Sequence, residues 1–549
     1  MPTAQPKPFV GEPVLPELAA ELPSAPERTE TQGIDASWID PLCREQDSST
    51  RMPNPNYIDI MFSEYAPDFG GMPRPEQPGY LTDCINLRST PNGYRGRPSF
   101  ADVTSASVIP GSTTYGLGGC FYIQGTTAFF FMNSAGSIYE SRGEGVATWL
   151  NVTPSSGAAS LPYGDICQFG NDVVWIVQSR APLKKALTSS QATLFTNLGG
   201  SPPTALHGAR IRNHLVLGNL STADPYGVRT SAIGDHEDWP TVGSSDALAK
   251  ESIYESLNPE YGQIQRVMGG EKFGIVMQDH ALTRMTYVGG STVYEFDTYE
   301  RIEGSGLSSF FSRPVTDGRL WYWYDDYGIY ATDGYSVKSV SEGKIDEALF
   351  NNTISHPQGS SIHEALTSAY DPRRSQILFG STANSSPGSA RYQLCYNVTD
   401  GSIQIMNDPN GMAMFSGMAT NGAAASKQIF NIDAGNLKLQ RLDGATGTIA
   451  LQTGYMELAP GRRVQIQGAH LLGAGVPGSL TLAYKSTSSL GSVDVSQSGF
   501  TSLTAPTRGM KSVGRATDQF FAFRVTGTGA ESQLLKGIRV YFTEAEPAT

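Results

Sequence analysis

Hydrophobic positions in the middle of the chain fall into short paired segments that are separated by Gly, Asn and Asp. In the clearest pair, residues 319–334, aromatic and β-branched residues predict two strands around a tight turn, with an Asp-Gly turn behind them. Comparable segments are found at residues 128–139, 173–187, 214–230, 273–287, 377–396 and 429–439. Their starts lie roughly 40–60 residues apart, which is the period of propeller blades. The pattern therefore predicts an all-β fold with a β-propeller of six or seven blades over residues 81–444.

The turns along this region repeat one chemistry. Asp-Gly turns occur at residues 317–318, 333–334, 400–401 and 443–444. Because Asp-Gly readily adopts the positive φ values of tight hairpin turns, these dipeptides support strands on both sides. One short helix is predicted over residues 341–350, where Ile345, Leu349 and Phe350 fall on one face.

Beyond residue 444 the hydrophobic pattern changes to alternation with period two. We expect strands at residues 448–457, 464–467, 479–484, 520–525 and 537–542. Such alternation suits antiparallel strands that are buried on one face. Residues 445–549 are therefore predicted to form a C-terminal β-sandwich-like domain appended to the propeller.

The first 80 residues are rich in proline and show no strand pattern, with seven prolines among residues 1–35. Proline fixes φ and removes a hydrogen-bond donor, so residues 1–80 are predicted to form an extended N-terminal arm. The arm carries five apolar candidate anchors: Phe9, Val10, Leu15, Leu18 and Leu22. They suggest an arm that becomes ordered on a neighbouring subunit; the alternative is a leader without contacts.

Composition narrows the classes of function. The 549-residue chain has 39 Lys and Arg against 52 Asp and Glu, a net charge of −13, which is not typical of a protein that grips DNA. Its five cysteines are widely spaced without a Cys-x-x-Cys pair, so we expect reduced thiols rather than a zinc knuckle or a disulfide framework. The sequence shows neither an apolar signal core nor an apolar run long enough for a membrane helix. These features predict folding in a reducing cytoplasm.

Motifs for catalysis are missing from the sequence. It contains no Gly-x-Ser-x-Gly, His-Glu-x-x-His or Walker phosphate loop, so we expect no enzyme activity, no cofactor and no metal. The densest polar segment is residues 235–239, but carboxylates adjacent in sequence rarely face one substrate, which favours a structural loop. The aromatic block at residues 321–324 could stack on sugars or bases, although packing between blades is the more common use.

Three segments, at residues 229–239, 328–346 and 524–540, resemble the tail nozzle family of short-tailed phages (podoviruses). This family is also called the tail hub or packaged-DNA stabilisation protein, and the resemblance spans residues 80–545. It implies a homohexameric tube below the portal and adaptor rings that closes the DNA exit and conducts DNA on ejection. It also implies a place in the virion tail after folding in the host cytoplasm. The implied partners are further copies of the chain, the tail adaptor ring, tail fibre or needle proteins, and double-stranded DNA that passes without sequence recognition.

Within such a conduit, the narrowest point should be formed by polar or acidic loops past which phosphates slide. Asp333 and Asp400, each in an Asp-Gly turn, are the candidate channel residues. Two other functions remain open. One is a carbohydrate-binding or glycan-cleaving propeller that acts as a receptor-binding tail component, and the other is a monomeric scaffold propeller. A glycosidase would need two carboxylates roughly 5–10 Å apart in an aromatic-rich cleft.

Overall fold

The computed structural model of the chain describes most of its sequence beyond residue 55. The described residues are 56–103, 108–110, 116–122, 128–134, 137–142, 148–155, 164–177, 180–300, 314–325, 328–350, 366–381, 392–407, 411–421, 424–433, 438–475, 480–489, 496, 498–503, 511–512 and 517–547. They belong to one compact unit, residues 55–549. The predicted anchors Phe9, Val10, Leu15, Leu18 and Leu22 lie outside the described residues.

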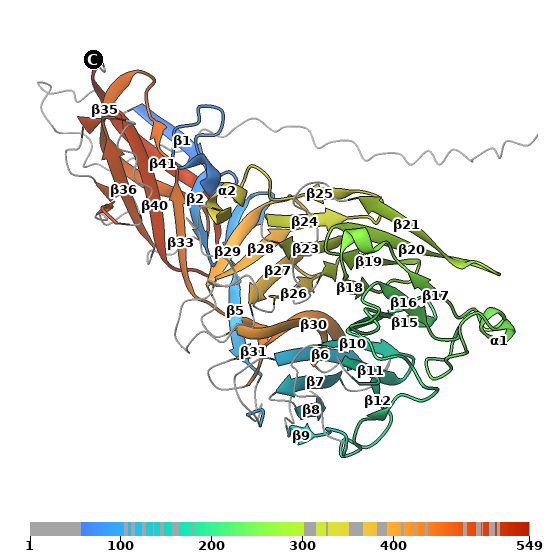
Figure 1. The fold of residues 1–549 in the computed structure, drawn as a ribbon. Coiled ribbons are helices and arrows are strands. Elements are labelled where there is room, and N and C mark those ends of the chain that lie inside the picture. Colours follow the sequence, from blue (N-terminus) through green and yellow to red (C-terminus); the bar gives the residue numbers. More distant parts are fainter. Residues whose placement is uncertain are drawn as a thin grey trace, which may run out of the picture. The chain divides into compact units, whose positions relative to one another are not determined.

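Six four-stranded antiparallel sheets and a four-stranded antiparallel part of a larger sheet, here called blades one to seven, follow one another through the described part of the chain (Figure 1). The strands of blade one are β6 (Gly116–Tyr122), β7 (Ala128–Ser134), β8 (Ser137–Arg142) and β9 (Leu150–Asn151). The strands of blade two are β10 (Gly164–Phe169), β11 (Asp172–Val177), β12 (Leu183–Ala186) and β13 (Thr196–Asn197). The strands of blade three are β14 (His207–Ile211), β15 (His214–Gly218), β16 (Gly227–Thr230) and β17 (Tyr254–Ser256).

Blades four to six continue this order, whereas blade seven combines strands from distant parts of the sequence. The strands of blade four are β18 (Ile264–Met268), β19 (Phe273–Gln278), β20 (Ala281–Gly289) and β21 (Val293–Glu300). The strands of blade five are β22 (Val315–Thr316), β23 (Trp321–Asp325), β24 (Gly328–Thr332) and β25 (Val337–Ser339). The strands of blade six are β26 (Leu366–Asp371), β27 (Gln376–Ser381), β28 (Tyr392–Asn397) and β29 (Ile403–Asn407). The strands of blade seven are β30 (Gly411–Asn421), β31 (Ala424–Asp433), β32 (Leu439–Thr446) and β5 (Pro98–Asp102).

The blades form a closed ring. First strands lie against one another from blade one to blade four and from blade five to blade six, and blades four and five share a hydrophobic cluster. Strand β30 contacts both β6 and β26, so blade seven lies between blades six and one. Strand β5, blue in Figure 1, pairs antiparallel with β32, with Ala101 opposite Arg441. This pairing joins the two ends of the propeller sequence and supplies the fourth strand of blade seven. The prediction of a β-propeller is confirmed, with seven blades.

The C-terminal region consists of two packed sheets that include strands from both ends of the unit. Strands from the N-terminal side are β1 (Asn56–Met61), β2 (Leu81–Ile85), β3 (Leu87–Thr90) and β4 (Gly93–Gly96). Strands from the C-terminal side are β33 (Thr448–Thr453), β34 (Met456–Glu457), β35 (Arg462–Ala474), β36 (Thr481–Thr487), β37 (Thr501–Ser502), β38 (Lys511–Ser512), β39 (Thr517–Asp518), β40 (Phe520–Thr528) and β41 (Leu534–Pro547). One sheet has the order β3-β4-β41-β35-β38, with β1 on β41 and β39 on β35. The other runs β2-β33-β40-β36-β37, with β34 on β40.

The second of these sheets is continuous with the propeller. Strand β2 pairs in parallel with β29 of blade six, where Ile85 lies opposite Ile405, so the two form one ten-stranded sheet. Buried side chains of both C-terminal sheets share a single hydrophobic core with residues of blades five and six, including Tyr324 and Phe379. The β-sandwich-like domain is therefore joined to the propeller by backbone hydrogen bonds and by a common core.

The domain boundaries differ from those predicted. Residues 56–96 were divided between the arm and the propeller, but their strands belong to the C-terminal sheets, with Asn56 opposite Phe542. Local alternation shows that a segment is a strand and which face is buried, but it does not show which distant strand is its partner.

Helices are short in the described part of the chain: α1 (Ser245–Ala249), α2 (Asp346–Phe350), and the 3-10 turns η3 (Pro67–Phe69) and η4 (Pro259–Tyr261). The helix predicted at residues 341–350 is helical only from Asp346, because the Ser341 hydroxyl accepts a hydrogen bond from the Ile329 amide and holds the preceding turn. None of the described helices is long and apolar enough to cross a membrane.

Candidate functional site

The candidate channel residue Asp333 lies in the turn between β24 and β25 of blade five. Its carboxylate accepts hydrogen bonds from the amides of Tyr335 (2.9 Å) and Ser336 (3.0 Å). Partial burial alone would raise the pKa of Asp333, but these amides hold it below the usual value. The Asp333 carbonyl accepts a bond from Arg284 of blade four (3.2 Å), whose guanidinium lies 3.8 Å from the centre of the Tyr335 ring. Asp333 thus caps its own turn and contributes to the contact between two blades.

The second candidate, Asp400, lies in the corresponding turn of blade six, between β28 and β29. One carboxylate oxygen accepts bonds from the amide (2.9 Å) and hydroxyl (2.6 Å) of Ser402, and the other accepts the Ser89 hydroxyl of β3 (2.8 Å). The structure therefore places Asp333 and Asp400 in turns of adjacent blades with different partners, and Asp400 joins blade six to the C-terminal sheets. Their assignment to a channel stays a prediction.

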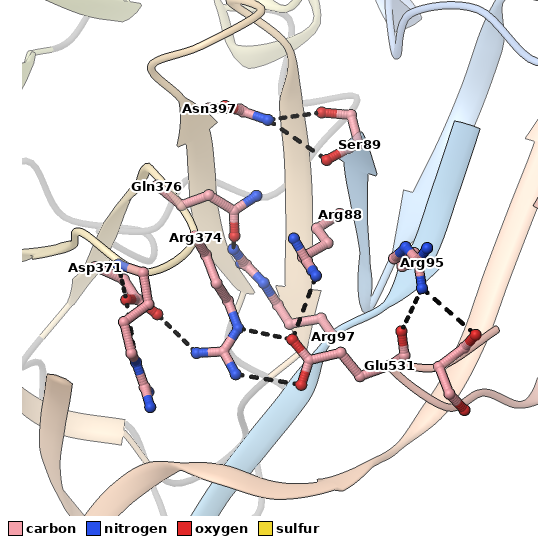
Figure 2. Close-up of polar contacts among 11 residues, drawn as sticks. Arg88, Ser89, Arg95, Arg97, Asp371, Arg374, Gln376, Asn397 and Glu531 are labelled. Carbon is pink, nitrogen blue, oxygen red and sulfur yellow. Dashed lines mark hydrogen bonds and ion pairs between the residues drawn. The ribbon is translucent and has the colours of Figure 1, made fainter. Parts of the chain in front are cut away.

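Asp400 belongs to a row of polar side chains at this junction, and Figure 2 shows the contact between two further members, Asn397 and Ser89. The Asn397 amide donates to the Ser89 hydroxyl at 3.0 Å, and the Gln404 amide donates to the hydroxyls of Ser402 (2.6 Å) and Ser89 (3.3 Å). All four of these side chains are buried. Because buried polar groups are costly to leave unpaired, the row favours one register of β3 against blade six.

Arg97 continues the row into the interior and is only 1% exposed. Its guanidinium donates to the Cys395 thiol and to the side-chain oxygen of Gln376, both in blade six. Burial raises the pKa of the Cys395 thiol, although the Arg97 charge opposes that shift, so the sulfur is neutral at ordinary pH. Arg97 is therefore a buried cation whose side-chain partners among the described residues are neutral.

An ion-pair network lies beside Arg97, around the loop that precedes β41 (Figure 2). Arg374, 10% exposed, donates to both carboxylate oxygens of Glu531 (3.0 and 3.3 Å) and also to Asp371 (2.8 Å). Arg88 of β3 donates to Glu531 at 3.3 Å. Partial burial would raise the pKa of Glu531, but the Arg374 hydrogen bond and the charges of its arginine neighbours hold it below the usual value.

Two further arginines complete this group. Arg95 of β4 donates to the backbone carbonyls of Glu531 (3.3 Å) and Ser532 (3.4 Å), and Arg373 lies 3.7 Å from Asp371. We call Arg88, Arg95, Arg97, Arg373 and Arg374, with Asp371 and Glu531, the arginine cluster. Five guanidinium groups face two carboxylates, so its net charge is +3 in a chain of net charge −13.

Sequence reasoning missed the arginine cluster. Its members come from three parts of the chain: β3, β4 and the residue after β4; the end of β26 and the turn that follows it; and the loop before β41. These parts are separated by more than 150 residues in the sequence. The available signals were two close arginine pairs, Arg95 with Arg97 and Arg373 with Arg374. Neither pair is conspicuous in a chain with 39 basic residues. Only the tertiary structure brings the two pairs close to each other.

The carboxylates of residues 235–239 have separate partners. Glu237 pairs with Lys184 of blade two and accepts the Gly199 amide at 3.0 Å, and the Lys184 hydrogen bond lowers its pKa. Asp238 pairs with Lys250 at 2.8 Å. The Trp239 indole donates to the His236 carbonyl at 2.9 Å. These contacts hold this loop, which joins β16 and β17 of blade three, against blade two, and they do not aim two carboxylates at a common point.

The aromatic block of blade five is largely buried. Tyr322, Trp323 and Tyr324 are all buried, and Trp323 stacks on Tyr330 with ring centroids 5.8 Å apart. Trp323 and Tyr330 also share a core cluster with Met268 and Met277 of blade four. These rings therefore serve as packing between strands and blades. Within the described ranges, no group of three His, Cys, Asp or Glu side chains is placed to hold a metal ion.

Comparisons with known proteins add a fold likeness alone. No protein-family model matches the sequence, and no curated protein matches it. Among solved structures, YCF48 bound to D1 peptide is 13% identical with a TM-score of 0.37, and the match covers 65% of this chain and 99% of that chain. The WD40 β-propeller domain of Doa1 is 9% identical (TM-score 0.38; 63% and 96% covered), and YCF48 from Cyanidioschyzon merolae is 12% identical (TM-score 0.36; 63% and 98% covered). At these TM-scores the similarities carry no weight for function, and the propeller assignment is based on the strand pairing described above.

Proposed function

We propose that this chain is a structural subunit of a phage tail, of the nozzle type. Six copies would form a tube below the portal and adaptor rings that closes the DNA exit and then conducts the DNA on ejection. Its other partners would be the adaptor ring and tail fibre or needle proteins. The chain would fold in the host cytoplasm and then be located in the virion tail.

The observation that carries the proposal is the continuity between blade six and the C-terminal sheets. Strands β29 and β2 belong to one ten-stranded sheet, and the two regions share one hydrophobic core. Cores packed in this way transmit strain instead of absorbing it. A subunit of a tube that retains packaged DNA needs such rigidity, whereas a hinged binding module does not.

The use of polar side chains agrees with a structural role. Arg374 pairs with Asp371 of its own blade and with Glu531 across the junction, and Glu237 and Asp238 pair with lysines of the fold. Catalytic carboxylates face a substrate together, as in glycosidases, where two of them lie roughly 5–10 Å apart in a cleft. The paired arrangement here favours the nozzle over a glycan-cleaving propeller.

The test is cryo-electron microscopy of phage tails that contain this chain, with native mass spectrometry of the same preparation. We expect six copies around the tail axis, next to the adaptor ring. A trimer or a dodecamer, or virions that lack the chain, would contradict the proposal. Saturable binding of the isolated chain to a glycan array would instead favour a receptor-binding propeller.

A further inference from the structure

The arginine cluster has more positive charge than its own carboxylates neutralise. Arg95 has only backbone carbonyls as acceptors among the described residues, and Arg97 has a thiol and an amide oxygen. Burial and the charges of Arg374, Arg97 and Arg95 outweigh the attraction of Glu531 and lower the pKa of Arg88. The guanidinium groups thus repel one another, and a further anion would relieve this repulsion.

The outer part of the cluster can be reached from solvent. The side chain of Arg373 is 35% exposed, that of Arg88 20% and that of Glu531 42%. The contacts of Glu531 indicate that a carboxylate is a suitable ligand, because its single carboxylate accepts hydrogen bonds from both Arg374 and Arg88. A guanidinium group presents several N–H donors in a plane, so Arg88, Arg95 and Arg373 retain donors for additional carboxylates.

We propose that this surface docks the acidic N-terminal segment, residues 1–55, of a second copy of the chain. The segment has four Lys and Arg against nine Asp and Glu, a net charge of −5. Its acidic residues are Glu12, Glu17, Glu21, Glu27, Glu30, Asp35, Asp40, Glu45 and Asp47. Opposite charges on the segment and the cluster would set which surfaces meet and speed their encounter.

Double-stranded DNA is the competing occupant, and it fits less well. Binding to DNA requires neutralisation of many phosphates along a stripe, whereas the arginine cluster is confined to one junction. The chain as a whole, at −13, repels a polyanion. A short acidic segment needs only a few arginines, and the copies of a ring would supply it at high local concentration. The inference rests on the proposed function only in requiring that copies lie next to each other.

A peptide assay tests the docking without requiring a ring. A fluorescein-labelled peptide with the sequence of residues 8–32 is titrated with the full-length chain, and binding is measured by fluorescence anisotropy. In that chain, Glu12, Glu17, Glu21, Glu27 and Glu30 are changed to Gln, so that its own segment does not compete. We expect saturable binding that weakens by at least about tenfold in the double variant R95E/R373E, and that also weakens with rising salt.

Matched controls separate specific docking from general attraction. The double variant R210E/R462E has the same change of charge at two exposed arginines, whose carboxylate partners are Glu271 and Glu544. It should bind the peptide almost as well as the parent. The milder R95Q/R373Q variant should lose part of the affinity for the peptide and keep the parent's circular dichroism spectrum. It therefore tests the same two arginines even if R95E/R373E does not fold.

Several outcomes would overturn the inference. These are no binding, equal binding of a peptide whose five Glu are Gln, or equal loss of affinity in R210E/R462E. Arginine-dependent binding of a DNA duplex that the peptide cannot displace would make the cluster a nucleic-acid surface instead. None of these results bears on the copy number in tails, so failure here is distinguishable from failure of the proposed function.

Discussion

Arg374 and Glu531 form a two-point ion pair, with Nε to Oε1 at 3.0 Å and Nη2 to Oε2 at 3.3 Å, although 157 residues separate them in the chain. Arg374 follows the first strand of blade six, and Glu531 precedes β41 of the C-terminal sheets. The pair therefore adds a side-chain link between the propeller and the β-sandwich to the backbone pairing of β2 with β29. Paired guanidinium and carboxylate planes of this kind set geometry as well as adding energy.

Replacement of Glu531 by Gln should destabilise this junction. Arg374 would keep its ion pair with Asp371 but lose its ion pair with Glu531. Because Glu531 is 42% exposed, water screens part of this interaction, and we expect a loss of about 1–2 kcal/mol in the free energy of unfolding. Urea unfolding followed by tryptophan fluorescence measures it. The control is E544Q, which removes an exposed partner of Arg462 and should cost less than about 0.5 kcal/mol. An equal loss of stability in E531Q and E544Q would show that the Arg374–Glu531 pair contributes no more than an exposed ion pair.

Arg97 offers a test of its buried charge. R97M keeps much of the side-chain volume and removes a cation without an anionic partner, whereas R97K keeps the charge and loses the planar donor fork. Because a buried, unpaired charge is costly, R97M should be more stable than R97K by at least about 1 kcal/mol. Chemical unfolding of both variants at the same pH gives the difference. If R97K were more stable than R97M, we would conclude that Cys395 is a thiolate that neutralises the charge of Arg97.

Buried His214 should make stability depend on pH. Its Nε2 lies 3.0 Å from the Glu251 carbonyl and its Nδ1 2.8 Å from the Tyr294 hydroxyl, so the neutral ring donates to the first and accepts from the second. Burial lowers the pKa of His214 below its usual value of 6.5. The unfolded chain therefore takes up a proton as the pH falls through 6.5 while the folded chain does not, and this contribution to stability is lost toward acidic pH.

The measurement for His214 is the melting temperature between pH 7.5 and pH 5 in steps of about half a unit. The wild type should lose more of its melting temperature over this range than H214Q, which is itself less stable at pH 7.5 because the ring fills a buried site. Parallel curves for the two proteins would assign the acid sensitivity to other groups.

The carboxylates of residues 235–239 should be dispensable for any catalysis. Single changes D235N, E237Q and D238N should leave a screen of glycan and ester substrates unchanged, with no turnover in the wild type. Loss of the Glu237–Lys184 pair should appear as a small decrease in melting temperature instead. Turnover by the wild type that one of these changes abolishes would overturn the structural interpretation.

Deletion of residues 1–35 separates a role in assembly from a role in folding. The segment contains too little apolar surface to fold alone, so the melting temperature should stay within about 2 °C of the full-length protein. Incorporation into virions, measured by immunoblotting of purified particles, should fall. Normal incorporation of the truncated chain would make the segment a leader without a structural role.

Local pattern was sufficient for the strands and for the class of fold. The aromatic and β-branched run at residues 321–332 predicts a hairpin, and the structure places β23 and β24 there. Side chains that alternate along a strand show their buried face without knowledge of any partner strand. Repetition of such hairpins at a blade-like interval was then enough to predict a propeller followed by a sandwich.

Pairing between distant strands was decided only by the tertiary structure. The closure of the ring requires Ala101 to meet Arg441, and the junction requires Ile85 to meet Ile405, and no local signal marks either contact. The same holds for Arg97, which looks like an ordinary surface arginine in the sequence and is buried against Gln376 and Cys395 in the fold. Hydrophobic periodicity depends on neighbours in the chain, whereas register, ring closure and ion pairing depend on which segments the folded backbone brings together.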